Sequence, residues 1–253
     1  MTGKFFWYEL MTSDPEAAAK FYGDVVGWGI QESGTEGYRL FTVTEGRGTA
    51  GLMALPDHLR DAKVPPHWMG YIAVEDVDET VEEIEDEEGT IHREPFEIPG
   101  VIRLAVVADP QGAGFIVARG LMEPPPTELA PGTPGTVGWH ELYTGNVEEA
   151  FDFYESLFGW TKGDAMDMGP AGIYQLFGMG GMPVGGMMKK PEPMPMPAWL
   201  YYFNVPALDA ATEKVDAGGG KILMGPIEVP GGLWIVQATD PQGAHFALVA
   251  PKR

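Results

Sequence analysis

Hydrophobic positions near the start of the chain change from a strand-like period to a helix-like period. Residues 4–11 read KFFWYELM, a strand-like segment whose successive side chains point to two opposite faces. Asp14, which is followed by a proline, then provides a helix N-cap and a residue suited to the first helical turn. Across residues 15–26 apolar side chains recur at helical spacing, and the stripe ends near Gly27. The chain therefore begins with a strand and an amphipathic helix.

The same strand and helix pattern returns three more times along the chain. Short apolar runs bounded by glycine, proline and aspartate predict strands after each helix. In the first part of the chain these strands are expected around residues 38–43, 51–55 and 69–74. Further apolar stripes predict helices around residues 77–84, 147–154 and 208–215. We interpret the chain as four units of one strand, one helix and three strands, which start near residues 4, 67, 136 and 198.

One stretch is present twice, which explains the repetition. Residues 7–28 read WYELMTSDPEAAAKFYGDVVGW and residues 139–160 read WHELYTGNVEEAFDFYESLFGW, with no gap between them when aligned. The sequence Asp-Pro-Gln-Gly-Ala, a β-turn signal, likewise occurs at residues 109–113 and 240–244. The halves of the chain therefore arose by duplication.

The duplication predicts two domains joined by a linker. Residues 120–135 are rich in proline and have no hydrophobic period, as expected of a semi-extended linker. We place the first domain at residues 1–121, the linker at 122–135 and the second domain at 136–253. Whether the units pair within each half or across the linker stays open at this point.

Composition excludes several classes of function. The formal net charge of −21, from 16 basic and 37 acidic residues, argues against binding to nucleic acid or to an anionic membrane. The chain has no cysteine, so a disulfide, a thiolate nucleophile and a thiolate metal site are excluded. No apolar run approaches the roughly 20 residues that span a bilayer, and the N-terminus lacks a signal-peptide pattern. We expect a cytoplasmic protein that is a monomer or a homodimer.

Several motifs in combination resemble the vicinal oxygen chelate superfamily, which includes glyoxalases, bleomycin resistance proteins and extradiol dioxygenases. They are the first strand, the helix ending in FYxxxxGW, the segments PHWxxY at 66–71 and PAWxxY at 197–202, and the closing DPQGAxF turn. The likeness covers nearly the whole chain outside the linker and is greatest to tandem glyoxalase-like proteins of actinobacterial type. It implies an α+β fold in which four βαβββ modules form two cupped mixed β-sheet domains.

The resemblance also implies where a metal would be bound, because members of the superfamily hold a divalent ion on the concave face through His and Glu. In this sequence apolar side chains or thioethers occupy all of the carried-over ligand positions. These positions are Trp7, Met53, Met69, Ile116, Trp139, Met188, Leu200 and Ala247. We therefore expect no divalent metal cofactor at the usual place.

Alternation along the predicted strands indicates which side chains line each cup instead. If Trp7 and Trp139 face inwards, then Glu9 and Glu141 do so as well. The other residues expected to face the cups and contact a ligand are Met11, Met53, Met69, Tyr71, Tyr143, Met188, Leu200, Tyr202 and Asn204. Two mostly apolar cavities, each with one buried carboxylate, would suit a small-molecule ligand.

Glu9 and Glu141 have two interpretations. A carboxylate beside Trp and Met must be hydrogen bonded if it is to stay ionised, so it either holds neighbouring backbone in place or acts as a catalytic base. Recurrence in both halves, where both folds need the same residue, favours the structural interpretation.

Two other features stay open. His140 lies beside Glu141, but adjacent strand residues face opposite sides, so the two side chains are not expected to converge on one ion. The methionine-rich segment 178–197 is compatible with a pocket lid, with irregular core filling or with a mobile loop.

The leading hypothesis is a metal-free member of this fold that binds a small apolar or aromatic molecule. One alternative is a glyoxalase-like lyase, isomerase or dioxygenase, which either uses metal ligands placed elsewhere or uses Glu9 or Glu141 as a general base. Another is a non-catalytic protein that binds a partner. The sequence does not choose the ligand.

Overall fold

A computed structural model of the chain describes residues 2–44, 46–121 and 129–253. Part of the predicted linker, at residues 122–128, therefore lies outside the described residues. The predicted domain boundaries stay a prediction.

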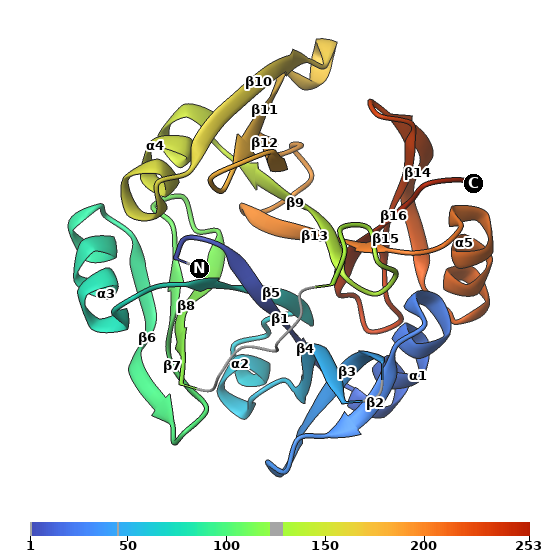
Figure 1. The fold of residues 1–253 in the computed structure, drawn as a ribbon, viewed down its shortest axis with the longest axis horizontal. Coiled ribbons are helices and arrows are strands. Elements are labelled where there is room, and N and C mark those ends of the chain that lie inside the picture. Colours follow the sequence, from blue (N-terminus) through green and yellow to red (C-terminus); the bar gives the residue numbers. More distant parts are fainter. Residues whose placement is uncertain (1, 45, 122–128) are drawn as a thin grey trace. The chain divides into compact units, whose positions relative to one another are not determined.

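The first half of the chain contains two βαβββ modules. The elements of the first module are β1 (Phe5–Thr12), α1 (Pro15–Val26), β2 (Gly29–Glu32), β3 (Tyr38–Thr44) and β4 (Arg47–Ala54). After a short helix α2 (Asp57–Asp61), the second module consists of β5 (His67–Ala73), α3 (Val77–Asp86), β6 (Thr90–Ile98), β7 (Ile102–Ala108) and β8 (Gly114–Gly120) (Figure 1).

The second half repeats this order. The third module consists of β9 (Val137–Thr144), α4 (Val147–Phe158), β10 (Thr161–Asp167), the 3-10 turn η1 (Gly169–Ala171), β11 (Ile173–Gly178) and β12 (Pro183–Lys189). The fourth consists of β13 (Ala198–Asn204), α5 (Leu208–Ala217), β14 (Lys221–Val229), β15 (Leu233–Thr239) and β16 (His245–Ala250).

Within the described ranges, hydrogen bonds join the strands into two eight-stranded mixed sheets. Their orders are β2-β3-β4-β1-β5-β8-β7-β6 and β10-β11-β12-β9-β13-β16-β15-β14. In every module the first strand runs parallel to the last strand, and the remaining pairs within the module are antiparallel. The predicted α+β class and the four βαβββ modules are confirmed.

Two short elements were not located by the hydrophobic pattern. All residues of β2 are exposed, so no alternation in burial marks it, and it forms through antiparallel pairing with β3. Helix α2 has no buried residue, so it has no apolar stripe either. Strand β4 also begins earlier than predicted, at Arg47, because the pairing with β3 extends beyond the apolar run.

The compact units combine the four modules differently from the two sheets. Unit 1 comprises Met1–Phe6, Met69–Glu128 and His140–Trp199, and unit 2 comprises Trp7–Trp68, Leu129–Trp139 and Leu200–Arg253. Unit 1 thus contains most of the second and third modules, and unit 2 most of the first and fourth. Strand pairing stays within each half of the sequence, whereas each compact unit takes one module from each half.

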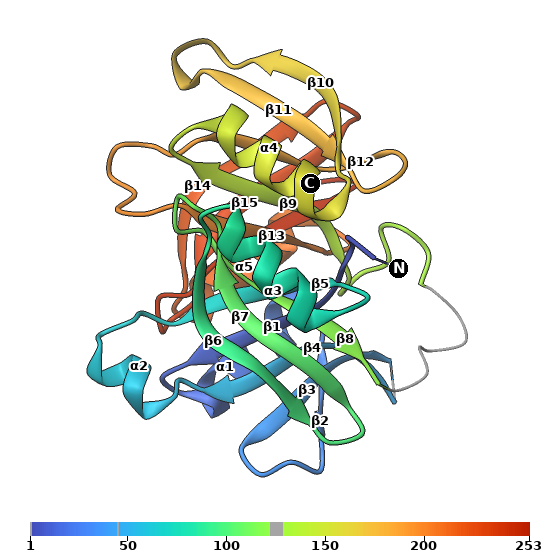
Figure 2. The same ribbon diagram turned by 90° about the vertical axis from the view of Figure 1, so that its left-hand side faces the viewer.

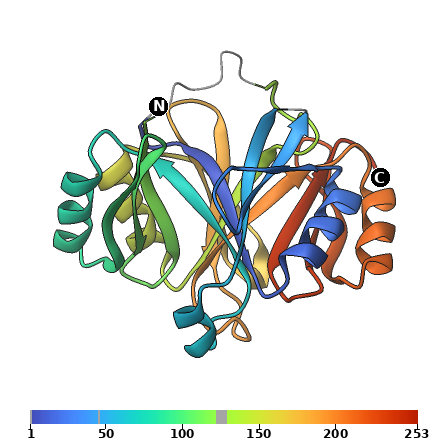
Figure 3. The ribbon, with the colours of Figure 1, turned by 90° about the horizontal axis from the view of Figure 1, so that it is seen from below.

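The helices of each unit lie beside one another. In unit 2, α1 contacts α5, as Figure 3 shows for the blue and orange helices. In unit 1, α3 contacts α4 (Figure 2). The apolar stripe of α1, which includes Phe21 and Tyr22, is buried as its spacing predicts.

A buried tyrosine hydroxyl joins the two modules of unit 2. Tyr22 of α1 is 0% exposed, and its hydroxyl donates to Oδ2 of Asp240 at 3.1 Å and accepts from Nε1 of Trp68 at 2.9 Å. The other oxygen of Asp240 accepts from the backbone N–H groups of Gln242 and Ala244. Burial raises the pKa of Asp240, and these hydrogen bonds act in the opposite direction. The closing turn of the fourth module is thereby bound to the helix of the first.

Unit 1 contains the same arrangement, formed by the duplicated counterparts of these three residues. The hydroxyl of Tyr154 donates to Oδ2 of Asp109 at 3.2 Å and accepts from Nε1 of Trp199 at 3.1 Å. Burial likewise raises the pKa of Asp109. The Asp-Pro-Gln-Gly turn and the Phe-Tyr pair recur in the sequence because each turn docks on the helix of a module from the other half.

The repeated Gly-Trp that follows each of these helices anchors the entry into a first strand. Nε1 of Trp160 donates to the carbonyl of Gly3 at 2.6 Å, and Nε1 of Trp28 donates to the carbonyl of Gly135 at 2.8 Å. Gly135 has φ of 85°, and a Cβ there would lie 2.8 Å from Nε1 of Trp28. Only glycine fits this position without strain.

We expect Tyr154→Phe to lower the free energy of unfolding by about 1–3 kcal/mol, because it removes a buried partner from both Asp109 and Trp199. Urea denaturation measures the effect. A double-mutant cycle with Trp199→Phe tests the assignment, since residues that share one hydrogen bond have a coupling energy of about 0.5 kcal/mol or more. Additive effects of the two substitutions would contradict it.

Candidate functional site

Glu141 is held by a tyrosine that lies across a glycine. Glu141 on β9 is directly opposite Gly186 on β12, and its side chain is 5% exposed. Tyr174 of β11 occupies the space that a side chain at Gly186 would take, since a Cβ there would lie 2.0 Å from the tyrosine ring. The hydroxyl of Tyr174 donates to Oε2 of Glu141 at 2.9 Å. The carboxylate is therefore buried and hydrogen bonded.

Glu9 has the same surroundings in unit 2. It lies opposite Gly51 on β4, and a Cβ at Gly51 would lie 2.0 Å from the hydroxyl of Tyr38. Tyr38 is hydrogen bonded to Glu9 and accepts from Nε1 of Trp7 at 3.2 Å. Burial, and then the negative charge of Glu9, raise the pKa of Tyr38, so the phenol stays protonated and donates to the carboxylate.

The sequence reasoning did not identify Tyr38 or Tyr174. A signal was present, because Tyr-x-Leu-Phe occurs at residues 38–41 and again at 174–177. Each copy is followed, on the next strand, by a glycine two residues before a methionine, at Gly51 and at Gly186. Only strand pairing shows that the tyrosine and the glycine are neighbours of the glutamate.

The strand register places several predicted residues on the same face as these carboxylates. In unit 2, Met11 on β1 is opposite Met53 on β4, two positions along from Glu9 and Gly51. In unit 1, Tyr143 on β9 is opposite Met188 on β12, two positions along from Glu141 and Gly186. Each glutamate therefore shares its sheet face with a methionine and a further aromatic or thioether side chain.

The remaining predicted residues lie on β5, β9 and β13. In unit 1, Met69 and Tyr71 are on β5, with Tyr71 opposite Ile116. In unit 2, Trp139 is on β9 and Leu200, Tyr202 and Asn204 are on β13, with Tyr202 opposite Ala247. Each unit therefore contains only part of the lining expected for either cavity.

Two of these residues have polar contacts that constrain their roles. The hydroxyl of Tyr202 accepts from Nε2 of Gln237 at 2.7 Å. Nδ2 of Asn204 donates to the carbonyl of Thr136 at 3.2 Å and to its hydroxyl at 3.0 Å, which holds the entry into β9. Asn204 thus stabilises local backbone in addition to any contact with a ligand.

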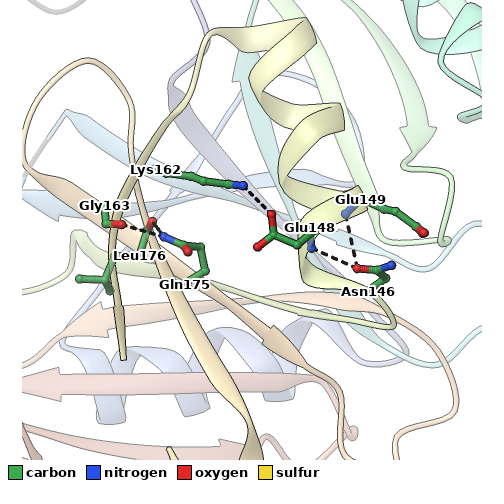
Figure 4. A network of polar contacts seen from close by, with 7 residues as sticks. All are labelled: Asn146, Glu148, Glu149, Lys162, Gly163, Gln175 and Leu176. Carbon is green, nitrogen blue, oxygen red and sulfur yellow. Dashed lines mark hydrogen bonds and ion pairs between the residues drawn. The ribbon is translucent and has the colours of Figure 1, made fainter. Parts of the chain in front are cut away.

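A polar network fixes β11, the strand that carries Tyr174 (Figure 4). The pairing of β10 with β11 is irregular between Lys162 and Ala165. The buried side chain of Gln175 donates to the carbonyl of Gly163 in this irregularity at 2.8 Å. Lys162 forms an ion pair with Glu148 of α4 at 2.6 Å. These contacts tie the edge of the sheet to the helix, and so keep Tyr174 in place.

The donor set around the two glutamates does not match a divalent metal centre. In the parts of the chain that the structure describes, no group of three or more His, Cys, Asp and Glu residues is arranged to hold an ion. One polar partner of each glutamate is a phenol that donates to the carboxylate, and a protonated phenol is a poor ligand for a divalent ion.

His140 belongs to different surroundings from Glu141. Its ring stacks on Phe5, with centroids 4.5 Å apart and planes 10° from parallel, and its Nδ1 lies 3.0 Å from the carbonyl of Val184. Because a carbonyl only accepts, the proton is on Nδ1. Burial lowers the pKa of His140 to about 4, so the ring is neutral at pH 7.

A family model matches most of the chain and identifies its superfamily. The model described as Glyoxalase/Bleomycin resistance protein/Dioxygenase superfamily matches residues 4–117 and 136–248. The chain belongs to this superfamily. The resemblance inferred from the repeated motifs is confirmed, and so is the tandem arrangement, because each half matches the model separately.

Relatives of this chain include proteins of similar length. "Putative glyoxylase CFP32" of Mycobacterium tuberculosis (strain CDC 1551 / Oshkosh) is 31% identical over 249 residues, which cover 97% of this chain and 94% of the relative. "Anthracycline biosynthesis protein DnrV" of Streptomyces peucetius is 31% identical over 262 residues, which cover 96% of this chain and 91% of the relative.

Solved structures of this superfamily share the fold at low sequence identity. The Mn(II)-bound glyoxalase from Novosphingobium aromaticivorans is 15% identical, with a TM-score of 0.71 over 99% of this chain and 82% of that chain. The 2,3-dioxygenase LapB from Pseudomonas sp. KL28 is 14% identical, with a TM-score of 0.66 over 99% and 93%. In addition, none of the described helices is long and apolar enough to cross a membrane.

We expect Gly186→Ala to displace Tyr174 and break its hydrogen bond to Glu141, because the new methyl group would overlap the ring. The free energy of unfolding should fall by about 1–3 kcal/mol, the cost of leaving a buried polar group unsatisfied. Urea denaturation and the NMR signals of the Tyr174 ring provide the measurement.

The matched control is Gly181→Ala, which adds the same methyl group where no atom lies within 4 Å. It should leave stability nearly unchanged. Equal effects of the two substitutions would show that Tyr174 does not depend on the glycine.

Proposed function

We propose that this protein binds a small, mostly apolar or aromatic molecule at the sheet faces that carry Glu9 and Glu141, without a divalent metal. One observation carries the proposal. Where the superfamily resemblance places metal ligands, this chain has tryptophan, methionine and aliphatic residues, and the nearby carboxylate is hydrogen bonded to tyrosine instead. This composition favours an organic ligand over a metal ion.

The side chains at each face divide into two roles. Trp7, Met11 and Met53 offer aromatic and thioether surface near Glu9, and burying such surface is worth about 25 cal/mol per Å² of apolar area. Glu9 and Glu141 orient the ligand, since each carboxylate accepts a hydrogen bond from a ligand O–H or N–H group. The tyrosines hold the carboxylates in position, so little entropy is lost on binding.

A second candidate function is metal-free catalysis of an isomerase or lyase type. A buried carboxylate oriented by a phenol, present in both halves, has the arrangement of a general base. In such a reaction Glu141 would remove a proton from a carbon next to a carbonyl, and Tyr174 would keep the carboxylate oriented. Relatives named for glyoxylase activity and for anthracycline biosynthesis are compatible with chemistry on organic molecules.

The proposal extends to location and partners. With a net charge of −21, the protein is proposed to act away from nucleic acid and anionic membranes. We place it in the cytoplasm as a monomer or a homodimer whose ligand is a small organic molecule.

Protein purified without chelator should contain well below one equivalent of Fe, Zn, Ni or Mn per chain, because the carried-over ligand positions have no His or carboxylate. Elemental analysis by mass spectrometry measures the metal content. Binding is measured separately, with 2-naphthol as an aromatic probe. A stoichiometric metal, whose removal by chelator also abolishes 2-naphthol binding, would overturn the metal-free assignment.

Glu141→Gln should weaken binding of 2-naphthol by about tenfold while the fold is kept, because a hydrogen bond to a charged acceptor is worth roughly 1.5 kcal/mol or more. Titration calorimetry measures the affinity, and circular dichroism checks the fold. Glu155→Gln removes a charge from the exposed face of α4, away from the contacts that hold Tyr174, and serves as the control. Unchanged affinity, or an unfolded Glu141→Gln protein, would assign Glu141 a structural role only.

A further inference from the structure

Unit 1 contains a hollow of about 310 Å³ whose lining includes neither Glu141 nor Tyr174. Its walls are formed by the start of β1 and the residue before it, by β9, by the connection from β11 to β12 and by the start of β12. The lining side chains used here are Lys4, Phe5, His140, Met179, Met182 and Val184. The volume is at the lower end of the range for small-molecule pockets.

The rim of the hollow is a tight turn with an exposed methionine. A Cβ at Gly178 would lie 2.9 Å from the carbonyl of Gly181, and Gly180 has φ of 81°, so the turn closes only because these residues are glycines. Met182 at its end is 84% exposed. A flexible, polarisable thioether on the rim favours contact with an aromatic ring.

Part of the lining is aromatic and uncharged. The parallel stack of Phe5 and His140 is fixed by the hydrogen bond from His140 to Val184. Burial keeps the imidazole neutral at pH 7. This wall is not a duplicated feature, because Tyr8 takes the place of His140 in the first half.

A single cation completes the lining. Lys4 is exposed and forms no ion pair with any carboxylate that the structure describes, unlike Lys20, Arg103 and Lys162. In a chain with a net charge of −21, an ammonium group beside an aromatic wall favours one anionic group on the ligand.

We infer that this hollow is a second ligand site, distinct from the faces of Glu9 and Glu141, for a small planar aromatic acid. The ring lies between the Phe5–His140 stack and the methionines, and the acid group lies near Lys4. The site goes beyond the proposed function, because it uses the opposite face of β9 and lining residues that are not duplicated between the two halves.

Titration of the full-length protein with 2-naphthoate tests the inference, with the methionine methyl groups labelled with ¹³C and followed by NMR. Saturable shifts should appear at Met179 and Met182, because an aromatic ring shifts the signals of neighbouring methyl groups. Shifts at Met11, Met53 and Met188 instead would place the aromatic acid at the glutamate faces and overturn the inference, as would no shift at all.

The variant Lys4→Met tests whether the charge of Lys4 contributes to binding. Lys4→Met keeps the length of the side chain and removes the charge, so 2-naphthoate should bind about threefold more weakly, as expected for an exposed ion pair. Binding of the neutral 2-naphthamide should not depend on Lys4. Equal effects of Lys4→Met on the acid and the amide would contradict the assigned anionic group.

Gly181→Trp fills the hollow from the turn, where a Cβ meets no atom within 4 Å and φ is not positive. It should abolish the 2-naphthoate shifts and leave 2-naphthol binding at the glutamate faces unchanged, which separates this inference from the proposed function. Gly120→Trp is the matched control, since Gly120 has the same open space and an ordinary φ. Normal 2-naphthoate binding by Gly181→Trp would overturn the site.

Discussion

A buried tyrosine hydroxyl between an indole N–H and a carboxylate is the interaction on which each compact unit depends. Tyr22 joins Trp68 to Asp240 in unit 2, and Tyr154 makes the equivalent connection in unit 1. The aspartate organises its own turn through backbone N–H groups, so one carboxyl group connects turn, helix and strand. A buried group with this many partners is costly to disturb, because each lost hydrogen bond leaves a polar atom unsatisfied.

At the glutamate faces, too, a tyrosine hydroxyl is hydrogen bonded to a carboxylate, but there it orients the carboxylate of a candidate site. Tyr174 and Tyr38 each cross a glycine to reach a glutamate, and the glycine is needed because any side chain would occupy the place of the ring. The pair leaves a buried, oriented carboxylate surrounded by apolar side chains. Such a site can recognise an organic ligand, and it can act as a base, but its donor set does not suit a divalent ion.

Duplication explains why the sites occur in pairs and also where the halves differ. Glu9 and Glu141 have matching partners, whereas His140 corresponds to Tyr8 and stacks on Phe5 in a pair that is not duplicated. The turn at residues 179–182, with its glycines and exposed Met182, is also specific to the second half. Common features therefore belong to the fold, and differences between the halves mark the places where a separate function can develop.

The sequence by itself determined the four βαβββ modules, the positions of the helices and the superfamily, because periodic burial and repeated motifs are local properties of the chain. It also determined that Glu9 and Glu141 need a partner. It did not reveal Tyr38 and Tyr174 as those partners, nor β2, whose residues are all exposed. The tertiary structure decided these points, because strand register and the pairing of modules across the two halves are set by contacts between residues far apart in the chain.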